Sequence, residues 1–501
     1  MGAPHQLAKT HPADDGGHDP TSSRVSLFIG VVLFCSYAYF YSGTGANQNS
    51  HFDLTRALVE QHTIQMDAYQ WNTGDAAFFQ GHYYCDKAPG LSLLAAPVWE
   101  LVRAVARIMG NDPSSERTVK AGLYAAGVVT VALPAALALA LLLLAALKMG
   151  ASPGGAVFGA IALGLGSPLW CYATLFWGHA AAGAFLVFAF AAAMALGEPG
   201  SPAKAVWLGL AVGLAGGWAT LIEYPAAPAA AILAGYAFLN AWKGQRGRMW
   251  RVGLSIACGA MLCAVILCSY NWAAFHSIAN LSYKYQVGFP ETQQGFFGIG
   301  YPKLRVMWSL LAGLYRGLLP LAPELLLAPV GLAMIWRNPK TRRHLLVVAG
   351  IPLYYYLLNS SYVNWYGGWC YGPRYLSAGL FFLLPALALV WTAAGAKMRA
   401  FLTVLTASGI SLTLVAVSTY PQPDEDWARP IPQLVKAFAA GQVPMDYASS
   451  VGSNAGVFFG LRGIPSLIPL LVMWSIAALV YLYLFRDTRL AIPNQSLDDE
   501  R

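Results

Sequence analysis

Apolar residues are gathered along the chain into long runs, separated by short polar, basic or aromatic segments. Several of these runs reach the roughly 20 residues that a helix needs to cross a bilayer. The pattern predicts about twelve membrane-spanning helices, at residues 26–42, 118–147, 154–170, 179–197, 204–221, 224–241, 252–272, 306–336, 344–359, 375–394, 400–419 and 464–485. We therefore expect an all-α polytopic membrane protein.

The two ends of the chain depart from this pattern. Residues 1–25 are polar and rich in Gly and Pro, which predicts a disordered cytoplasmic segment. They are too long and too acidic for the front end of a cleaved signal, so the first apolar run is expected to remain as a span. Residues 26–485 then form one transmembrane domain, and residues 486–501 form a cytoplasmic tail.

Basic loops indicate the orientation. The loops at 242–251 (WKGQRGRMWR), 337–343 (RNPKTRR) and 395–399 (GAKMR) are rich in Lys and Arg and should be cytoplasmic. With twelve spans, both termini fall on the same side as these loops. The segments that then face outward are 43–117, 171–178, 222–223, 273–305, 360–374 and 420–463. Nearly all the aromatic and charged motifs lie in them, so we expect an active site that faces the periplasm or exterior of a bacterial plasma membrane.

Composition supports the membrane class and excludes others. Apolar residues make up 57% of the chain and charged residues 11%, against roughly a quarter charged in soluble domains. The basic residues that give the net charge of +8 lie in short loops between spans, which argues against nucleic-acid binding. No glycine-rich phosphate loop follows a strand, so a nucleotide site is not expected. The seven cysteines match no zinc or redox spacing, although any two of Cys85, Cys171 and Cys370 could form a bridge.

The first outer segment, 43–117, carries the most chemistry. Asp53 precedes an amphipathic stretch, LTRALVEQH, and the motif HYYCDKAPG (82–90) places an acid and a base beside Pro89-Gly90. The following run, LSLLAAPVWELVRAVARIM, has apolar and basic positions at helical spacing. It predicts an interfacial helix that lies on the bilayer, a surface suited to a lipid substrate.

These motifs resemble the GT-C class of membrane glycosyltransferases, and most closely the protein O-mannosyltransferases and the bacterial aminoarabinose transferase of lipid A. The likeness lies in Asp53-Leu54-Thr55-Arg56, in Asp86-Lys87-Ala88-Pro89-Gly90, and later in Trp365, Tyr371 and Arg374 before a span. It implies transfer of a sugar from a polyprenyl-phosphate carrier to an acceptor on the outer face. Relatives have Asp-Glu at the acid, whereas Leu54 follows Asp53 here. This difference weakens a metal site and leaves a divalent cation an open question.

The chemistry of such a transfer assigns roles to several residues. A carboxylate must take the proton from the acceptor hydroxyl, and cations must hold the phosphate that leaves. We expect Asp53 to be the base, and Lys87, Arg374 and Arg316 to bind the donor phosphate, with inversion at the anomeric carbon. The acceptor is a lipid, a cell-envelope glycan or a protein. Further candidates for substrate binding are Arg56, Tyr84, Asp86, His179, Glu223, Trp365 and Tyr371.

Each role has a structural alternative. Asp53 could cap the helix that follows it, and Asp86 and Lys87 could form a surface ion pair. Lys87 and Arg374 could be snorkelling anchors. His179 could be an interfacial histidine. Glu223 could lie near the outer cavity or be paired, and Arg316 could form a buried ion pair with Glu324.

The alternative function is a transporter of a lipid or of a polyprenyl-phosphate sugar. Such transporters usually carry internal repeats. We find none in this chain, so the glycosyltransferase is the favoured hypothesis.

Overall fold

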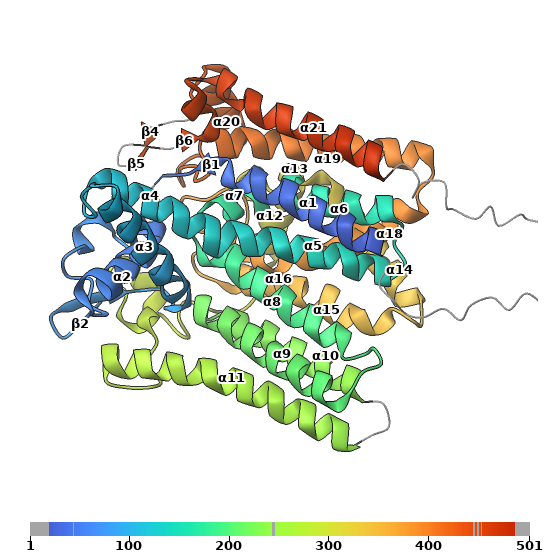
Figure 1. Cartoon of the computed structure of the whole chain (residues 1–501), viewed down its shortest axis with the longest axis horizontal. Coiled ribbons are helices and arrows are strands. Elements are labelled where there is room, and N and C mark those ends of the chain that lie inside the picture. The colour runs from blue at the N-terminus through green and yellow to red at the C-terminus, as the bar shows by residue number, and fades with distance from the viewer. Residues whose placement is uncertain are drawn as a thin grey trace, which may run out of the picture.

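The computed structural model describes residues 20–43, 45–242, 246–443, 446–447, 450–451 and 453–485. Long helices run side by side in a bundle, and α2, α3 and the strands β2, β4 and β5 lie toward one end of it (Figure 1). The helices of the first half are α1 Pro20–Ala38, α2 Ala46–Arg56, α3 Gly90–Ile108, α4 Glu116–Gly127, α5 Leu133–Lys148, α6 Pro153–Gly166, α7 Leu169–Thr174, α8 Gly178–Ala195, α9 Pro202–Ile222, α10 Ala226–Ala241 and α11 Arg246–Phe275.

The second half has shorter helices in its middle and long ones at its end. They are α12 Leu304–Ala312, α13 Leu318–Leu321, α14 Ala328–Arg337, α15 Leu345–Val348, α16 Gly350–Ser361, α17 Ser377–Leu380, α18 Leu384–Ala393, α19 Ala396–Ser418, α20 Pro430–Ala439 and α21 Ile468–Leu484. The strands are β1 Phe40–Tyr41, β2 Ala76–Phe79, β3 His82–Cys85, β4 Asp446–Tyr447, β5 Ser450–Val451 and β6 Ser453–Asn454.

Eight helices of the described chain are long and apolar enough to cross a membrane: Thr21–Ala38, Glu116–Lys148, Gly178–Ala195, Pro202–Ile222, Gly247–Phe275, Arg374–Ala393, Ala396–Ser418 and Ile464–Leu484. Two shorter apolar helices, α6 and α10, accompany them. The all-α polytopic class is therefore confirmed, whereas the number of twelve spans is not.

The predicted single span at 306–336 is wrong. The structure breaks this stretch into α12, α13 and α14. Gly313 and Gly317 have extended backbones that end one helix and precede the next, and two prolines follow at Pro320 and Pro323. Glycine and proline both disfavour a continuous helix. Arg316 lies within this break rather than inside a membrane helix.

Small residues let the long helices approach closely. A Cβ atom added at Gly213 of α9 would lie 2.1 Å from the Ile256 carbonyl oxygen of α11, and one added at Gly259 of α11 would lie 2.5 Å from the Leu210 carbonyl oxygen. Lipid tails are as apolar as the helix surfaces, so such close packing rather than a hydrophobic driving force holds membrane helices together. The contact holds α9 against α11, and Glu223 directly follows the last residue of α9.

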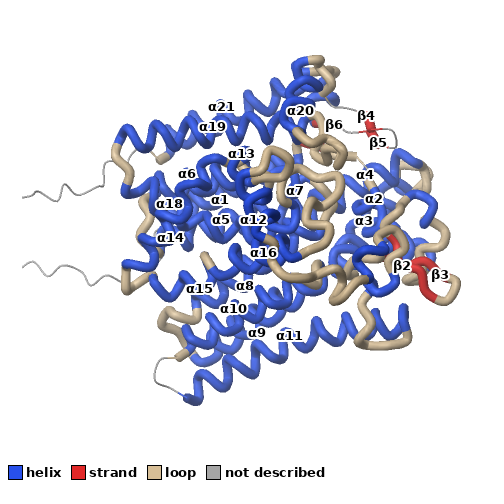
Figure 2. Tube along the Cα trace, turned by 180° about the vertical axis from the view of Figure 1, so that it is seen from behind, coloured by secondary structure: helices blue, strands red, loops and turns tan. Residues whose placement is uncertain are grey.

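The functional segments share one end of the bundle. The helices α11 and α19 begin at the end where α1 begins and α21 ends, and the hairpin β2–β3, α2 and α3 lie at the opposite end (Figure 1). Strand β6 joins the chain just after α1, because β1 pairs antiparallel with β6, with Phe40 opposite Asn454. Figure 2 shows the loops near α7, α12 and α16 at this same end.

The first outer segment folds as a helix, a hairpin and a second helix. In the hairpin, Ala76 lies opposite Cys85 and Phe79 opposite His82. The two turn residues, Gln80 and Gly81, have φ values of 50° and 90°, and two successive positive φ values suit the twist of a two-residue hairpin. The open end of the hairpin therefore brings residue 75 beside residues 86 and 87.

Helix α3 is amphipathic, as the sequence predicts. It buries Trp99 against Phe52, with ring centroids 5.4 Å apart, and exposes Leu101, Val105 and Ile108. It is not among the helices that meet the criteria for a membrane span. That it lies on the bilayer surface stays a prediction.

Candidate active site

A cavity of about 670 Å³ lies at the end of the bundle that carries the hairpin. Its polar walls come from segments far apart in the sequence: the start of α2, the open end of the hairpin, the start of α8, the end of α9 and the loop before α17. The side chains with charge or hydrogen-bonding capacity on these walls include Asn47, Asp75, Lys87, His179, Glu223, Gln286, Asn359, Arg374 and Glu425. Apolar residues of α10 and α16 line another part of the cavity.

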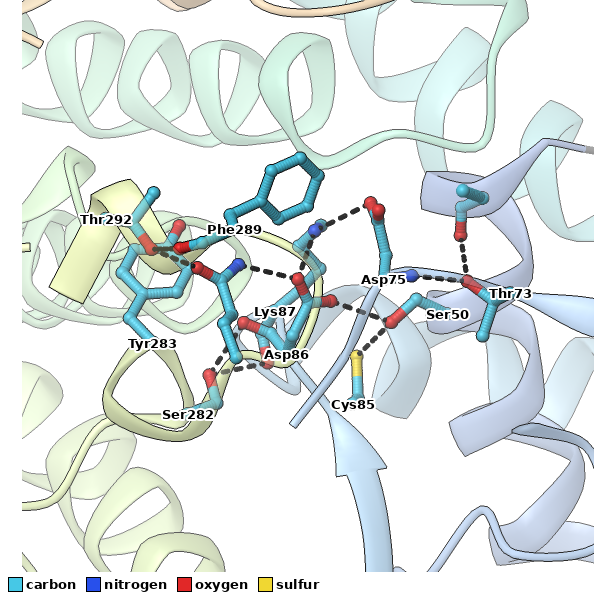
Figure 3. Close-up of polar contacts among 12 residues, drawn as sticks. Ser50, Thr73, Asp75, Cys85, Asp86, Lys87, Ser282, Tyr283, Phe289 and Thr292 are labelled. Atoms are coloured by element: carbon cyan, nitrogen blue, oxygen red, sulfur yellow. Dashed lines mark hydrogen bonds and ion pairs between the residues drawn. The ribbon is translucent and has the colours of Figure 1, made fainter. Parts of the chain in front are cut away.

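Lys87 stands between two carboxylates. Its ammonium group lies 2.9 Å from Asp75 Oδ2 and 2.6 Å from Asp86 Oδ2, as Figure 3 shows. Although burial opposes its charge, the two carboxylates raise the pKa of Lys87 above its ordinary value. The predicted surface ion pair is therefore a buried triad, and snorkelling does not describe Lys87.

Asp86 is the inner member of this triad. It is fully buried, and its carboxylate accepts hydrogen bonds from Ser50 Oγ at 2.9 Å and from Gln286 Nε2 at 2.7 Å. Ser282 Oγ donates to the Asp86 backbone carbonyl at 2.8 Å, so the loop after α11 also holds the hairpin end (Figure 3). Asp75 and Lys87 are the members that line the cavity.

Arg374 is a cavity cation of a different kind. Its guanidinium donates to the Gly367 carbonyl at 2.7 Å and lies over the rings of Trp177 and Tyr375, 4.8 and 4.9 Å from their centroids. Its Nε has no hydrogen-bond partner, and no carboxylate of the described residues forms an ion pair with it. A buried positive charge without a counter-ion favours binding of an anion.

His179 and Glu223 form a second charged pair on the cavity wall, with His179 Nδ1 3.1 Å from Glu223 Oε1. Burial would raise the pKa of Glu223, but the charge and hydrogen bond of His179 outweigh it and lower that pKa. Both residues meet at the cavity because α9 ends at Ile222, just beside the start of α8. Glu223 fits both interpretations from the sequence, because it lines the cavity and is paired with His179.

Arg316 stabilises the backbone turn that also binds Arg374. Its guanidinium donates to the carbonyls of Tyr366 at 3.1 Å and Gly368 at 2.8 Å. These carbonyls flank the one that holds Arg374, so two arginines fix the same turn. Arg316 is fully buried and is not a cavity-lining residue, and no ion pair joins it to Glu324. The structural alternative of an Arg316–Glu324 pair is wrong.

Asp53 lies away from the cavity wall. Helix α2 begins at Ala46 after Gly45, so Asp53 is in the middle of a helix and the interpretation as a helix cap is wrong. The side chain is 1% exposed, Oδ1 accepts from Asn72 at 3.2 Å, and Oδ2 has no partner among the described residues. Burial raises the pKa of Asp53 to about 7.

The cavity thus contains four of the residues singled out in the sequence: Lys87, His179, Glu223 and Arg374. The others are not cavity-lining residues: Asp53, Arg56, Tyr84, Asp86, Arg316, Trp365 and Tyr371. Among these, Arg56 pairs with Glu60 at 2.9 Å, and the Tyr371 carbonyl accepts from Tyr172 at 2.8 Å. Both contacts lie within the fold rather than at the cavity.

Sequence reasoning missed Asp75. The signal was present in DAAFFQGHYYCDK, in which two short aromatic runs flank the turn pair Gln80-Gly81. Pairing the runs about that turn places Asp75 beside Asp86 and Lys87. Trp177, Asn47 and Glu425 were missed for lack of any comparable local signal.

Metal ligands and disulfides are not evident in the described chain. The described residues contain no group of three or more His, Cys, Asp or Glu side chains that could hold a metal ion. We therefore assign no metal ligand. All seven cysteines are among the described residues and are free, so no bridge joins Cys85, Cys171 and Cys370.

Two solved structures resemble this chain. The crystal structure of ArnT from Cupriavidus metallidurans bound to undecaprenyl phosphate has a TM-score of 0.54 and 16% identity, over 93% of this chain and 72% of that one. ArnT in the apo state has a TM-score of 0.51 and 16% identity, over 84% and 69%. No protein-family model and no curated protein matches the chain. The likeness confirms the predicted GT-C-like fold.

Proposed function

We propose that this chain is a membrane glycosyltransferase, which moves a sugar from a polyprenyl-phosphate donor to an acceptor hydroxyl in the outward-facing cavity. The observation that carries the proposal is Arg374, a partly buried guanidinium on the cavity wall that forms no ion pair with a carboxylate of the described residues. The fold that the chain shares with ArnT, a protein crystallised with undecaprenyl phosphate, supports the same chemistry.

The donor phosphate binds at Arg374 in this proposal. The guanidinium presents a planar fork of N–H donors that matches two phosphate oxygens. Stacking on Trp177 and the bond to Gly367 hold that fork in place before the donor arrives, so little reorganisation accompanies the growth of charge on the leaving phosphate. Lys87 adds a second positive charge on the wall, although its two carboxylate partners already offset it.

The isoprenoid tail requires an apolar path from the cavity to the bilayer. Ala227 and Pro228 of α10 and Tyr354 and Leu358 of α16 line the cavity, and Ala227 and Pro228 are exposed. We infer that the tail leaves the cavity between these two helices. The sugar then lies between Arg374 and the hairpin end, where an acceptor can approach from the outer face.

Replacement of Arg374 by Gln tests the proposal. A charge-assisted hydrogen bond contributes about 1.5–3 kcal/mol, so the variant should bind undecaprenyl phosphate about 10- to 100-fold more weakly than the native protein. Binding is measured in detergent by quenching of tryptophan fluorescence. The matched control is Arg399→Gln, since Arg399 is exposed and bonds to the Trp391 carbonyl away from the cavity. Unchanged affinity in Arg374→Gln would remove the phosphate assignment.

A second measurement separates transfer from transport. Metabolically labelled polyprenyl-phosphate sugars are incorporated with the protein into proteoliposomes, together with cell-envelope acceptors. A glycosyltransferase consumes the labelled lipid and releases free polyprenyl phosphate. Labelled lipid that crosses the bilayer intact would instead support the transporter.

A further inference from the structure

We propose that Asp75, positioned by Lys87, is the general base that activates the acceptor hydroxyl, and that Asp53 is not. This inference rests on the proposed glycosyl transfer and names the proton acceptor of the same site. Three observations carry it: the position of Asp75 on the cavity wall, the charge balance of its triad, and the pairing of the other cavity carboxylates.

The hairpin and α2 together hold Asp75 in place. The Asp75 backbone N–H donates to Thr73 Oγ1 at 3.0 Å, and that hydroxyl donates to the Ala46 carbonyl at the start of α2 at 2.7 Å (Figure 3). Lys87 fixes one carboxylate oxygen, Oδ2, at 2.9 Å. No described residue donates a hydrogen bond to the other oxygen, Oδ1. Asp75 therefore presents an oriented and unoccupied acceptor atom on the cavity wall.

The cavity wall carries an unbalanced negative charge at Asp75 and an unbalanced positive charge at Arg374. Asp75, Lys87 and Asp86 form a triad whose two acids and one base leave one formal negative charge. Asp86 is buried among Ser50, Gln286 and Lys87, so the excess charge faces the cavity through Asp75. The opposite charge, unpaired, is Arg374. Displacement with inversion needs a base for the acceptor hydroxyl and a cation for the leaving phosphate, and Asp75 and Arg374 supply both in one cavity.

The two other carboxylates on the cavity wall are less suited to this role. His179 pairs with Glu223 Oε1 at 3.1 Å. Glu425 lies beside the turn that holds Arg374, since its Oε2 is 3.8 Å from a Cβ built on Gly368, and it therefore borders the proposed phosphate site. Asp53 is excluded by position, because it is 1% exposed and not a cavity-lining residue.

The proposed step moves one proton and one electron pair. The acceptor O–H proton passes to Asp75 Oδ1 while the acceptor oxygen forms a bond to the anomeric carbon. The bond from that carbon to the phosphate oxygen breaks, and its electron pair stays on the phosphate, which Arg374 holds. Polyprenyl phosphate leaves, and Asp75 then releases the proton to water. Lys87 is a positioning residue, because its hydrogen bond fixes Asp75 Oδ2.

The test compares Asp75→Asn with Asp53→Asn, two variants that make the same chemical change. An amide keeps the shape of the side chain and can still accept from Lys87. We expect Asp75→Asn to bind undecaprenyl phosphate within about 3-fold of native and to release polyprenyl phosphate from labelled donor at least about 100-fold more slowly, the usual size of a lost general base. Asp53→Asn should transfer within about 3-fold of native.

The other outcomes are decisive as well. Transfer retained in Asp75→Asn, or lost in Asp53→Asn alone, overturns the assignment. A native protein that binds no undecaprenyl phosphate and transfers nothing contradicts the proposed function instead. If Asp75→Asn does not fold, Asp75→Ala is measured with added formate, a small carboxylate that can replace the missing base. Recovery of transfer supports the proposal, and failure of both variants to fold or of formate to restore transfer counts against it.

Discussion

At the scale of single residues, Asp53 shows how a suggestive ionisation property can mislead. A carboxyl group whose pKa is about 7 has the proton affinity expected of a general base near neutral pH. Burial is the main cause of that value here, and it outweighs the Asn72 hydrogen bond and the nearby charge of Arg56, which both lower the pKa of Asp53. A perturbed pKa therefore indicates a catalytic residue only where the group also borders a cavity.

This burial predicts a pH-dependent effect on stability. The pKa of Asp53 rises from 3.8 to about 7 on folding, so the folded state holds the proton more tightly. Stability is then lost as the pH rises from about 4 through about 7, by up to about 4 kcal/mol at 1.36 kcal/mol for each pKa unit. Asp53→Asn should raise the thermal unfolding midpoint in detergent at pH 8 and change it little at pH 4. A lower midpoint at pH 8 would contradict this account.

The sequence predicted that several candidate residues lie at one end of the molecule, and their roles stay predictions. Orientation by charge put Lys87, His179, Glu223 and Arg374 at one end, and all four line the cavity. Asp53 was expected to precede a helix that starts at Leu54, whereas α2 begins at Ala46, eight residues earlier, so that Asp53 lies within the helix and is buried. The burial of Arg316 behind the Gly367-Gly368 turn depends on contacts across 50 residues or more, which no local pattern records.

At the scale of elements, close helix packing is the feature most open to test. Gly213→Val would place a branched side chain where only 2.1 Å separates the added Cβ from the Ile256 carbonyl oxygen. Overpacking usually costs about 1–3 kcal/mol, so the thermal midpoint of the protein in detergent should fall. The control is Gly235→Val, because a Cβ at Gly235 meets nothing within 4 Å. Equal midpoints in the two variants would contradict the tight α9–α11 contact.

Hydrophobic patterning predicted the long helices well and the irregular ones poorly. The predicted spans at 179–197 and 204–221 differ from α8 and α9 by two residues or fewer at each end. The pattern failed at 306–336, since mean hydropathy does not register backbone breaks at glycine and proline. The hairpin β2–β3 was not predicted, although its turn pair was visible in the sequence.

At the scale of the whole molecule, the fold predicts one outward face. Trp71 is 77% exposed at the hairpin end, and Lys397 is exposed at the start of α19, at the opposite end of the bundle. In a Cys258→Ser background, a membrane-impermeant maleimide applied to intact cells or spheroplasts should label Trp71→Cys and not Lys397→Cys. Permeabilised membranes, in which both should react, provide the control. The reverse labelling would contradict the orientation.

The class of fold was predictable because hydropathy and loop charge act over whole segments. The number of spans was not, because a short helix such as α6 or α10 is apolar without being long enough to cross a bilayer. The cavity itself was beyond prediction, since its walls are brought together only by the packing of segments from 45 to 425.

The antiparallel pairing of β1 with β6 has a consequence for biosynthesis. Phe40 emerges from the ribosome early, and its partner Asn454 emerges more than 400 residues later. Gln422 and Glu425, which complete the cavity wall, also arrive late. A nascent chain that has inserted most of its helices therefore has no finished pocket, and the cavity wall is complete only when translation is nearly over.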